Sequence, residues 1–160
     1  MEFKIVKYLS RLGQGTWVDS LSFLLSSRRF MILLWLLVFA LVLLQSSASF
    51  VVIFFAFGLV VCFLLFFSEF VFKQVLAKLR GFRKRPYIAY PGRILGIGHL
   101  YTDASFPSSH MAGIVSLFVL AGGFVPYFFY LGIVFAVLMA FSRIHNGMHY
   151  LTDVLVGALL

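Results

Sequence analysis

The longest uncharged stretch of this chain limits its fold most strongly. No Asp, Glu, Lys or Arg occurs between Phe30 and Ser68. A single helix of that length would measure about 58 Å, nearly twice the ~30 Å hydrocarbon core of a bilayer. The polar sequence Gln45-Ser46-Ser47 lies near the middle of the stretch. We therefore predict two membrane-spanning helices with a turn at this point.

A second uncharged run extends from Met111 to Ser142 and is broken by glycines and by Pro126. It predicts two further helices. The last predicted helix, from His149, has 12 residues before Leu160 and would reach only about 18 Å. We expect the native chain to continue past this point. The whole sequence is 62% hydrophobic, above the share of about 45–50% in soluble proteins.

These patterns predict an all-α fold, a polytopic helical membrane bundle that forms one domain over residues 1–160. The expected spans are 30–46, 50–72, 108–123, 127–143 and 149–160 onward. Residues 1–27 are predicted to be an amphipathic segment at the membrane interface. Its apolar positions follow helical spacing opposite Lys4, Lys7 and Arg11, and Gly13-Gln14-Gly15 interrupts it.

The net charge of +8 is concentrated, because seven of the 13 Lys and Arg residues lie between Lys73 and Arg93. Nucleic acid is one partner for such a cluster. The cluster instead adjoins a predicted span and no nucleic-acid-binding fold is present, so we expect no nucleic-acid partner. A topology signal and attraction to lipid headgroups explain Lys73, Arg80, Arg83 and Lys84.

Three short blocks of residues carry the chemistry. In the last block, Arg143 is followed by His149 and Asp153. The spacing of four predicts that His149 and Asp153 share one face of a helix, so that the carboxylate holds the imidazole by one nitrogen. Arg143 would hold an anion beside the free nitrogen.

The two upstream blocks are Lys78 with Arg85-Pro86, and Pro107-Ser108-Ser109-His110. Pro is favourable at the start of a helix, and the first backbone N–H groups of a helix form an anion site. Ser108 adds a hydroxyl donor. A titratable His110 at the mouth of a membrane helix is costly and points to function. The long connection between the two blocks is predicted to be a functional loop.

Together the blocks resemble the type 2 phosphatidic acid phosphatase superfamily, with Ser109 in place of the family's Gly. The resemblance implies that His149 attacks phosphorus to form a phosphohistidine, Asp153 orients its ring, and His110 acts as general acid and base. It implies a phosphate cradle formed by Lys78, Arg85, Ser108, Ser109 and Arg143.

The expected activity is therefore metal-independent hydrolysis of a membrane lipid phosphate or diphosphate, with a phosphorylated lipid and the bilayer as partners. A transporter or channel, or a non-catalytic membrane adaptor, are the alternatives. We expect no cofactor, and we expect His99 and His145 to be interface residues. The resemblance implies a bacterial inner membrane and a periplasmic site, whereas the Lys and Arg count favours the cytoplasmic side.

Overall fold

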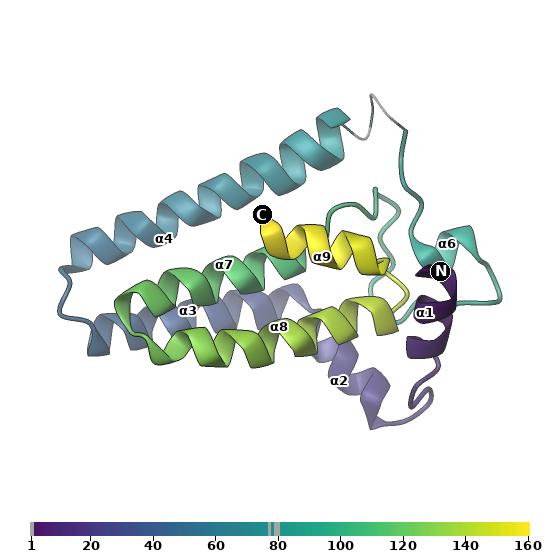
Figure 1. Cartoon of the computed structure of the whole chain (residues 1–160), viewed down its shortest axis with the longest axis horizontal. Helices are drawn as coiled ribbons and strands as arrows, with labels where there is room; N and C mark the ends of the chain where they lie inside the picture. The colour runs from purple at the N-terminus through teal and green to yellow at the C-terminus, as the bar shows by residue number, and fades with distance from the viewer. Residues whose placement is uncertain (1, 77, 79–80) are drawn as a thin grey trace.

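The computed structural model describes residues 2–76, 78 and 81–160, and every regular element among them is a helix (Figure 1). Arg80, one of the basic residues discussed above, lies outside the described residues. The elements in chain order are α1 (Glu2–Leu9), α2 (Trp17–Leu25), α3 (Arg28–Gln45), α4 (Phe50–Leu64), η1 (Leu65–Leu76), α6 (Pro86–Ala89), α7 (Ser109–Phe124), α8 (Tyr127–His145) and α9 (Leu151–Leu159).

Two helical hairpins form the body of the molecule. The first pairs α3 with α4, and the second pairs α7 with α8. Each turn follows from local sequence, because Ser49 caps α4 through its side chain and Pro126 precedes the first residue of α8. Both turns lie at the same end of the molecule (Figure 1). The starts of α3 and α7 and the end of α8 therefore meet at the opposite end.

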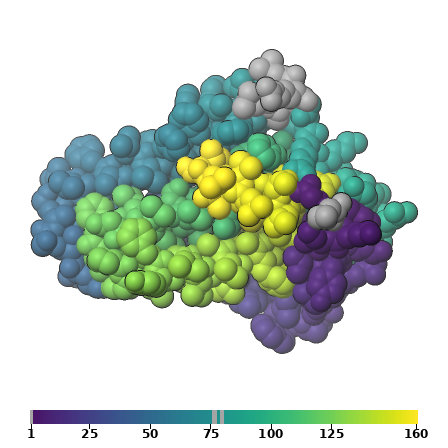
Figure 2. All heavy atoms as spheres, viewed as in Figure 1, coloured from purple at the N-terminus to yellow at the C-terminus, as the bar shows by residue number. Residues whose placement is uncertain are grey.

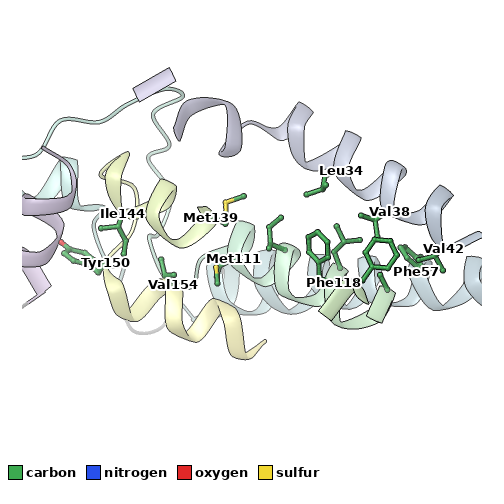
Figure 3. Packing of buried hydrophobic residues seen from close by; sticks show 14 of the residues in the cluster. Leu34, Val38, Val42, Phe57, Met111, Phe118, Met139, Ile144, Tyr150 and Val154 are labelled. Atoms are coloured by element: carbon green, nitrogen blue, oxygen red, sulfur yellow. The ribbon is translucent and has the colours of Figure 1, made fainter. Parts of the chain in front are cut away.

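Helix α7 is the centre of the core. Figure 3 shows Met111 and Phe118 of this helix among side chains of the surrounding helices. The ring of Phe118 stacks on that of Phe135 at a centroid distance of 5.0 Å. By contrast, α3, α4 and α8 expose many apolar side chains. Such apolar faces fit the hydrocarbon core of a bilayer.

Three helical stretches are long and apolar enough to cross a membrane: Arg28–Gln45, Phe50–Val75 and Tyr127–His145. They fit a multi-pass membrane protein. The stretch Phe50–Val75 combines α4 with η1, which continues it as a π-helix, with wider turns than an α-helix. The helix expected over 108–123 is α7, with 16 residues.

The ends of the chain differ in detail from the expectation. The predicted interfacial segment over 1–27 is two helices, α1 and α2, separated by a turn in which Gly13 and Gly15 have positive φ. Both helices pack on α8. Helix α9 begins at Leu151 and not at His149. Figure 2 shows α9 along one surface of the bundle, with α1 beside its first turn.

Candidate functional site

A pocket of about 360 Å³ lies at the end of the bundle where α7 begins and α8 ends. Two histidines, several cations and two carboxylates line it. The residues are Arg28, Leu65, Glu69, Lys73, Arg85, Tyr101, Asp103, Ser109, His110, Arg143 and His149. The structure thus brings together five of the predicted site residues and adds four charged groups and Tyr101 to them.

The turn after α8 places His149. Asn146 ends the helix, and Gly147 follows with a φ of +65°, a conformation that favours glycine. A Cβ atom on Gly147 would lie 2.8 Å from the carbonyl oxygen of Leu95. The turn then folds back, so that the amide of His149 donates to the carbonyl of Arg143 at 3.2 Å. His149 and Arg143 are therefore adjacent despite their separation in sequence.

The hydrogen bonds of His149 define its tautomer. Nε2 lies 3.3 Å from Nη1 of Arg85 and 3.2 Å from Nη2 of Arg143. Guanidinium groups only donate, so Nε2 accepts and Nδ1 carries the proton. Nδ1 donates to the carbonyl of Ser105 at 2.6 Å. Burial, and then Arg143 and Arg85, hold the pKa of His149 well below its usual range, so the ring is neutral with its free nitrogen among cations.

The partner of His149 corrects one expectation. His149 precedes α9, so His149 and Asp153 do not share a helical face, and Nδ1 lies 3.8 Å from the nearer carboxylate oxygen of Asp153. Ser105 takes the hydrogen bond that we expected for Asp153. The carboxylate is fully buried and accepts instead from the amide of Tyr150 at 2.8 Å. At this distance the carboxylate of Asp153 can influence the imidazole through its charge but not through a hydrogen bond.

Arg85 is buried, and protein groups already take its donors. Nε and Nη2 donate to the backbone carbonyl and the carboxylate of Asp103, at 3.2 and 2.6 Å. Nη1 donates to the carbonyl of Met148 and to Nε2 of His149. Burial raises the pKa of Asp103, but the charges and hydrogen bonds of Arg85 and Lys73 outweigh burial and hold it below the usual range.

Arg143 differs from Arg85 because no carboxylate within the described part of the chain pairs with it. Its side chain is buried, and its Nε has no hydrogen-bond partner among the described residues. An unpaired buried guanidinium is costly unless an anion compensates it. Arg143 therefore marks this pocket as a site for an anionic ligand.

The start of α7 contributes His110 and Ser109, which both line the pocket. Ser109 accepts a hydrogen bond from the hydroxyl of Ser68 at 2.9 Å. Ser108 does not line the pocket, contrary to expectation. Its hydroxyl is buried without a partner and its amide donates to the carbonyl of Asp153. Helix α9 packs closely on the segment that contains Ser108. This close packing is possible because residue 157 is glycine and has no Cβ atom.

Lys73 lines the pocket, whereas Lys78 is exposed and is not among the lining residues. The sequence analysis expected the opposite, because it placed Lys78 in the phosphate cradle and explained Lys73 as a topology signal. Ser68 and Lys73 are both buried and lie five residues apart, the spacing that a π-helix places on one face. The amine of Lys73 lies 3.0 Å from Glu69 and 3.5 Å from Asp103. The sequence pattern alone did not reveal the π-helical geometry.

His145 and His99, the two histidines that we expected to be interface residues, differ from each other in their surroundings. His145 is buried, and its ring nitrogens contact the carbonyl of Leu9 and the carboxylate of Asp19, both at 2.9 Å. It joins α8 to α1 and α2. His99 lines a neighbouring groove.

Sequence reasoning missed Asp103, although it is the only charged residue between Arg93 and Arg143. An isolated carboxylate in a loop next to a histidine block was a usable signal. No local signal pointed to Tyr101 or Arg28. In the described ranges 2–76, 78 and 81–160, no three His, Cys, Asp or Glu side chains are grouped as metal ligands.

The structure is a helical protein that fits a multi-pass membrane protein, and its candidate site is a pocket lined by two histidines and by buried cations. The profile of the PAP2 superfamily matches residues 57–160, a range that includes all three sequence blocks, and the chain belongs to that superfamily. Members of the superfamily are phosphatases, and the match supports hydrolysis of phosphoric esters. No curated protein and no solved structure matches the chain.

Proposed function

We propose that this protein is an integral membrane phosphatase that hydrolyses a lipid phosphate or diphosphate through a phosphohistidine at His149. One observation carries the proposal: the unprotonated Nε2 of His149 lies between the donors of Arg85 and Arg143. A phosphoryl group bound to those donors would have its phosphorus next to the nucleophilic nitrogen. Catalysis of phosphoryl transfer depends mainly on such positioning and charge stabilisation.

The proposed reaction has two steps. Nε2 of His149 attacks phosphorus, and the bond to the leaving oxygen breaks. His110, which takes up a proton when the negatively charged phosphate binds, gives that proton to the leaving oxygen. Neutral His110 then takes a proton from water, whose oxygen attacks phosphorus and breaks the P–N bond. Phosphate leaves, and both histidines return to their starting states. The negative charge of Asp153 stabilises the positive charge that His149 carries between the steps.

The phosphate-binding groups in this proposal are Arg143, Arg85, Lys73 and Ser109. Arg143 supplies the unpaired charge, and Nη1 of Arg85 turns from His149 to a phosphoryl oxygen as the histidine reacts. Lys73 takes the role that the sequence assigned to Lys78. Removal of one donor to a developing oxyanion typically costs about 2.7–4 kcal/mol of barrier.

A groove of about 560 Å³ supports a lipid substrate. It shares Arg28, Tyr101 and Arg143 with the pocket, so it is continuous with the site. Its apolar lining comes from α2, from the start of α3, from the loop after α6 and from the turn after α8; the apolar residues are Phe23, Leu24, Phe30, Leu33, Ile97 and Met148. The chain of a lipid would lie here while its phosphate reaches His149.

His149→Ala tests the mechanism. With purified protein in detergent and excess EDTA, we expect release of phosphate to fall by a factor of about 10³ or more, because no other group supplies the nucleophile. Radiolabelled substrate should leave an acid-labile, base-stable phosphoryl group on the unaltered protein and none on the variant. Turnover of H149A at the unaltered rate would refute the proposal.

Leu24→Trp tests the lipid assignment by filling the groove. We expect kcat/KM for a long-chain phosphorylated lipid to fall, while kcat/KM for a soluble phosphate ester stays unchanged. Leu36→Trp is the matched control, because Leu36 is an exposed residue of α3 outside the groove. Equal kcat/KM of the unaltered protein for long-chain and soluble esters would refute the lipid substrate but leave the phosphatase mechanism standing.

A further inference from the structure

A second group of charged residues, outside the lining of the pocket, contacts Asp153. Arg83, which precedes α6 in the chain, donates from Nη1 to the carboxylate of Asp153 at 2.5 Å and to the hydroxyl of Thr152 at 2.7 Å. Its Nη2 donates to Glu2 of α1 at 2.6 Å. The guanidinium also lies 4.1 Å from the ring centroid of Tyr150. Two carboxylates and a hydroxyl group thus accept from the guanidinium of Arg83, and the ring of Tyr150 covers its plane, so its orientation is fixed.

Glu2 also holds the start of α9 directly. One of its carboxylate oxygens accepts from Arg83, and the other accepts from the amide of Thr152 at 3.0 Å. That amide belongs to the first turn of α9, where backbone donors lack helical partners. Figure 1 shows α1 close to the start of α9, and the two helices are in contact. The first turn of α1 thus caps the helix that carries Asp153.

Asp153 needs such support because its carboxylate is completely buried. His149 lies beyond hydrogen-bonding distance at 3.8 Å, and a buried carboxylate without a close cation is strongly disfavoured. Arg83 supplies the closest cation. Glu2 balances the charge of Arg83, so that Arg83 is held between two carboxylates rather than drawn to one.

We propose that Arg83 and Glu2 are positioning residues for the proposed phosphatase reaction: Arg83 fixes the carboxylate of Asp153 behind His149, and Glu2 fixes Arg83. The N-terminal helix α1 is then a functional part of the site. This proposal depends on the proposed function, because it acts on the charge that His149 acquires when it takes up the phosphoryl group. If the carboxylate of Asp153 is displaced, the activation barrier for phosphoryl transfer to His149 rises, whereas the groups that bind phosphate are unaltered.

The test is a comparison of kcat and KM for variants on a soluble phosphate ester. We expect Arg83→Gln to lower kcat roughly tenfold with KM unchanged, the usual size of the effect for a group that orients a reacting residue. Arg83→Lys should restore part of kcat, because the ammonium still pairs with Asp153. Glu2→Gln should lower kcat less than Arg83→Gln. The double variant should resemble Arg83→Gln alone, because Glu2 acts through Arg83.

Lys84→Gln and Lys4→Gln are matched controls that remove exposed charges from the same two segments, and both should retain the unaltered kcat. The inference is overturned if Arg83→Gln retains kcat. It is also overturned if Arg83→Gln and Arg83→Lys lose kcat equally while their thermal midpoints fall together, since that pattern indicates structural support only. His149→Ala in the same assay separates the two proposals. Activity of that variant would refute the phosphatase mechanism itself.

Discussion

Asp103 and Arg143 give the pocket its electrostatic character. Asp103 forms ion pairs with Arg85 and Lys73. Arg143 lines the same pocket but has no carboxylate partner among the described residues. Arg28, which also lines the pocket, likewise has no carboxylate partner in the described part of the chain. An incoming anion therefore finds two cations without a carboxylate partner and two cations already in contact with an acidic side chain. The carboxylate of Asp103 is 41% exposed, so the solvent screens part of its charge.

Asp103→Asn should strengthen binding of anions. The substitution removes a negative charge that competes with phosphate for Arg85 and Lys73, so we expect the inhibition constant of vanadate to fall roughly threefold. Steady-state inhibition at fixed pH measures this constant. Asp19→Asn, which removes an acidic group outside the pocket, should leave it unchanged. Weaker inhibition of D103N would mean that Asp103 serves mainly to hold Arg85 in place.

His149 should make stability depend on pH. Its folded-state pKa is lowered by burial and by Arg143 and Arg85, so below about pH 6.5 the unfolded chain takes up a proton that the folded chain does not. Stability contributed by this group is present above pH 6.5 and is lost as the pH falls, by at most about 1.4 kcal/mol per pH unit. His149→Gln should therefore show a flatter fall in thermal midpoint between pH 7.5 and 5.5, measured by tryptophan fluorescence. If the thermal midpoints of the unaltered protein and of H149Q fall equally with pH, the lowered pKa of His149 is contradicted.

At the scale of elements, the contact between α9 and the start of α7 aligns the site. A Cβ atom on Gly157 would lie 2.4 Å from the backbone oxygen of Ser108 and 3.2 Å from the Cβ of Met111. The amide of Ser108 donates to the carbonyl of Asp153 across the same contact. Because backbone cannot move aside as a flexible side chain does, this approach requires glycine at position 157.

Gly157→Ala should separate α9 from α7. We expect a loss of about 1–3 kcal/mol of stability, the usual cost of inserting an atom into a packed contact, and a lower kcat because Asp153 moves with α9. Thermal unfolding and turnover measure the two effects. Gly58→Ala is the control, since a Cβ atom there meets nothing within 4 Å and alanine favours helix. An unchanged midpoint for G157A would show that the two helices can separate freely.

Local patterns predicted the elements well, because long apolar runs and the polar breaks between them are properties of neighbouring residues. Helix α3 and the α7–α8 turn lie within about two residues of their predicted positions. The position of Lys73 in the lining of the pocket depends on the π-helical turns of η1. The link from Arg83 to Asp153 depends on contacts between residues 70 positions apart. Neither is encoded in local periodicity, so the sequence could predict that five residues matter together but not the other residues that line their pocket. The five are Arg85, Ser109, His110, Arg143 and His149.

At the scale of the whole molecule, the N-terminal helices and the three sequence blocks lie at one end of the bundle (Figure 1). Two hairpins return the chain to that end, so the same residues lie on one side of any membrane that the helices cross. The family resemblance favours the periplasmic side for this end, and the abundance of Lys and Arg favours the cytoplasmic side.

Cysteine labelling tests this arrangement. In a Cys62→Ser background, which removes the only native cysteine, Lys7→Cys and Lys84→Cys should react with an impermeant reagent from the same side of the membrane. Ser47→Cys, in the turn between α3 and α4, should react from the other side. Labelling of positions 7 and 84 from opposite sides would refute the placement of the N-terminal helices and the sequence blocks on one side of the membrane. If both react from one side, that side is the one to which the site opens.

The two hairpin turns have a consequence for how the chain is inserted during synthesis. Neither turn, at residues 46–49 and at 125–126, contains a charged side chain, and no charge occurs in the rest of either hairpin between Phe30 and Ser68 or between Met111 and Ser142. Transfer of one charged side chain to the middle of a membrane costs about 2.5–3.5 kcal/mol on insertion scales. Each hairpin can therefore be translocated as a unit without moving a single charge through lipid. In the cytoplasmic orientation, the charged residues of the site therefore stay on the side on which the chain is made; in the periplasmic orientation, they have to cross the membrane.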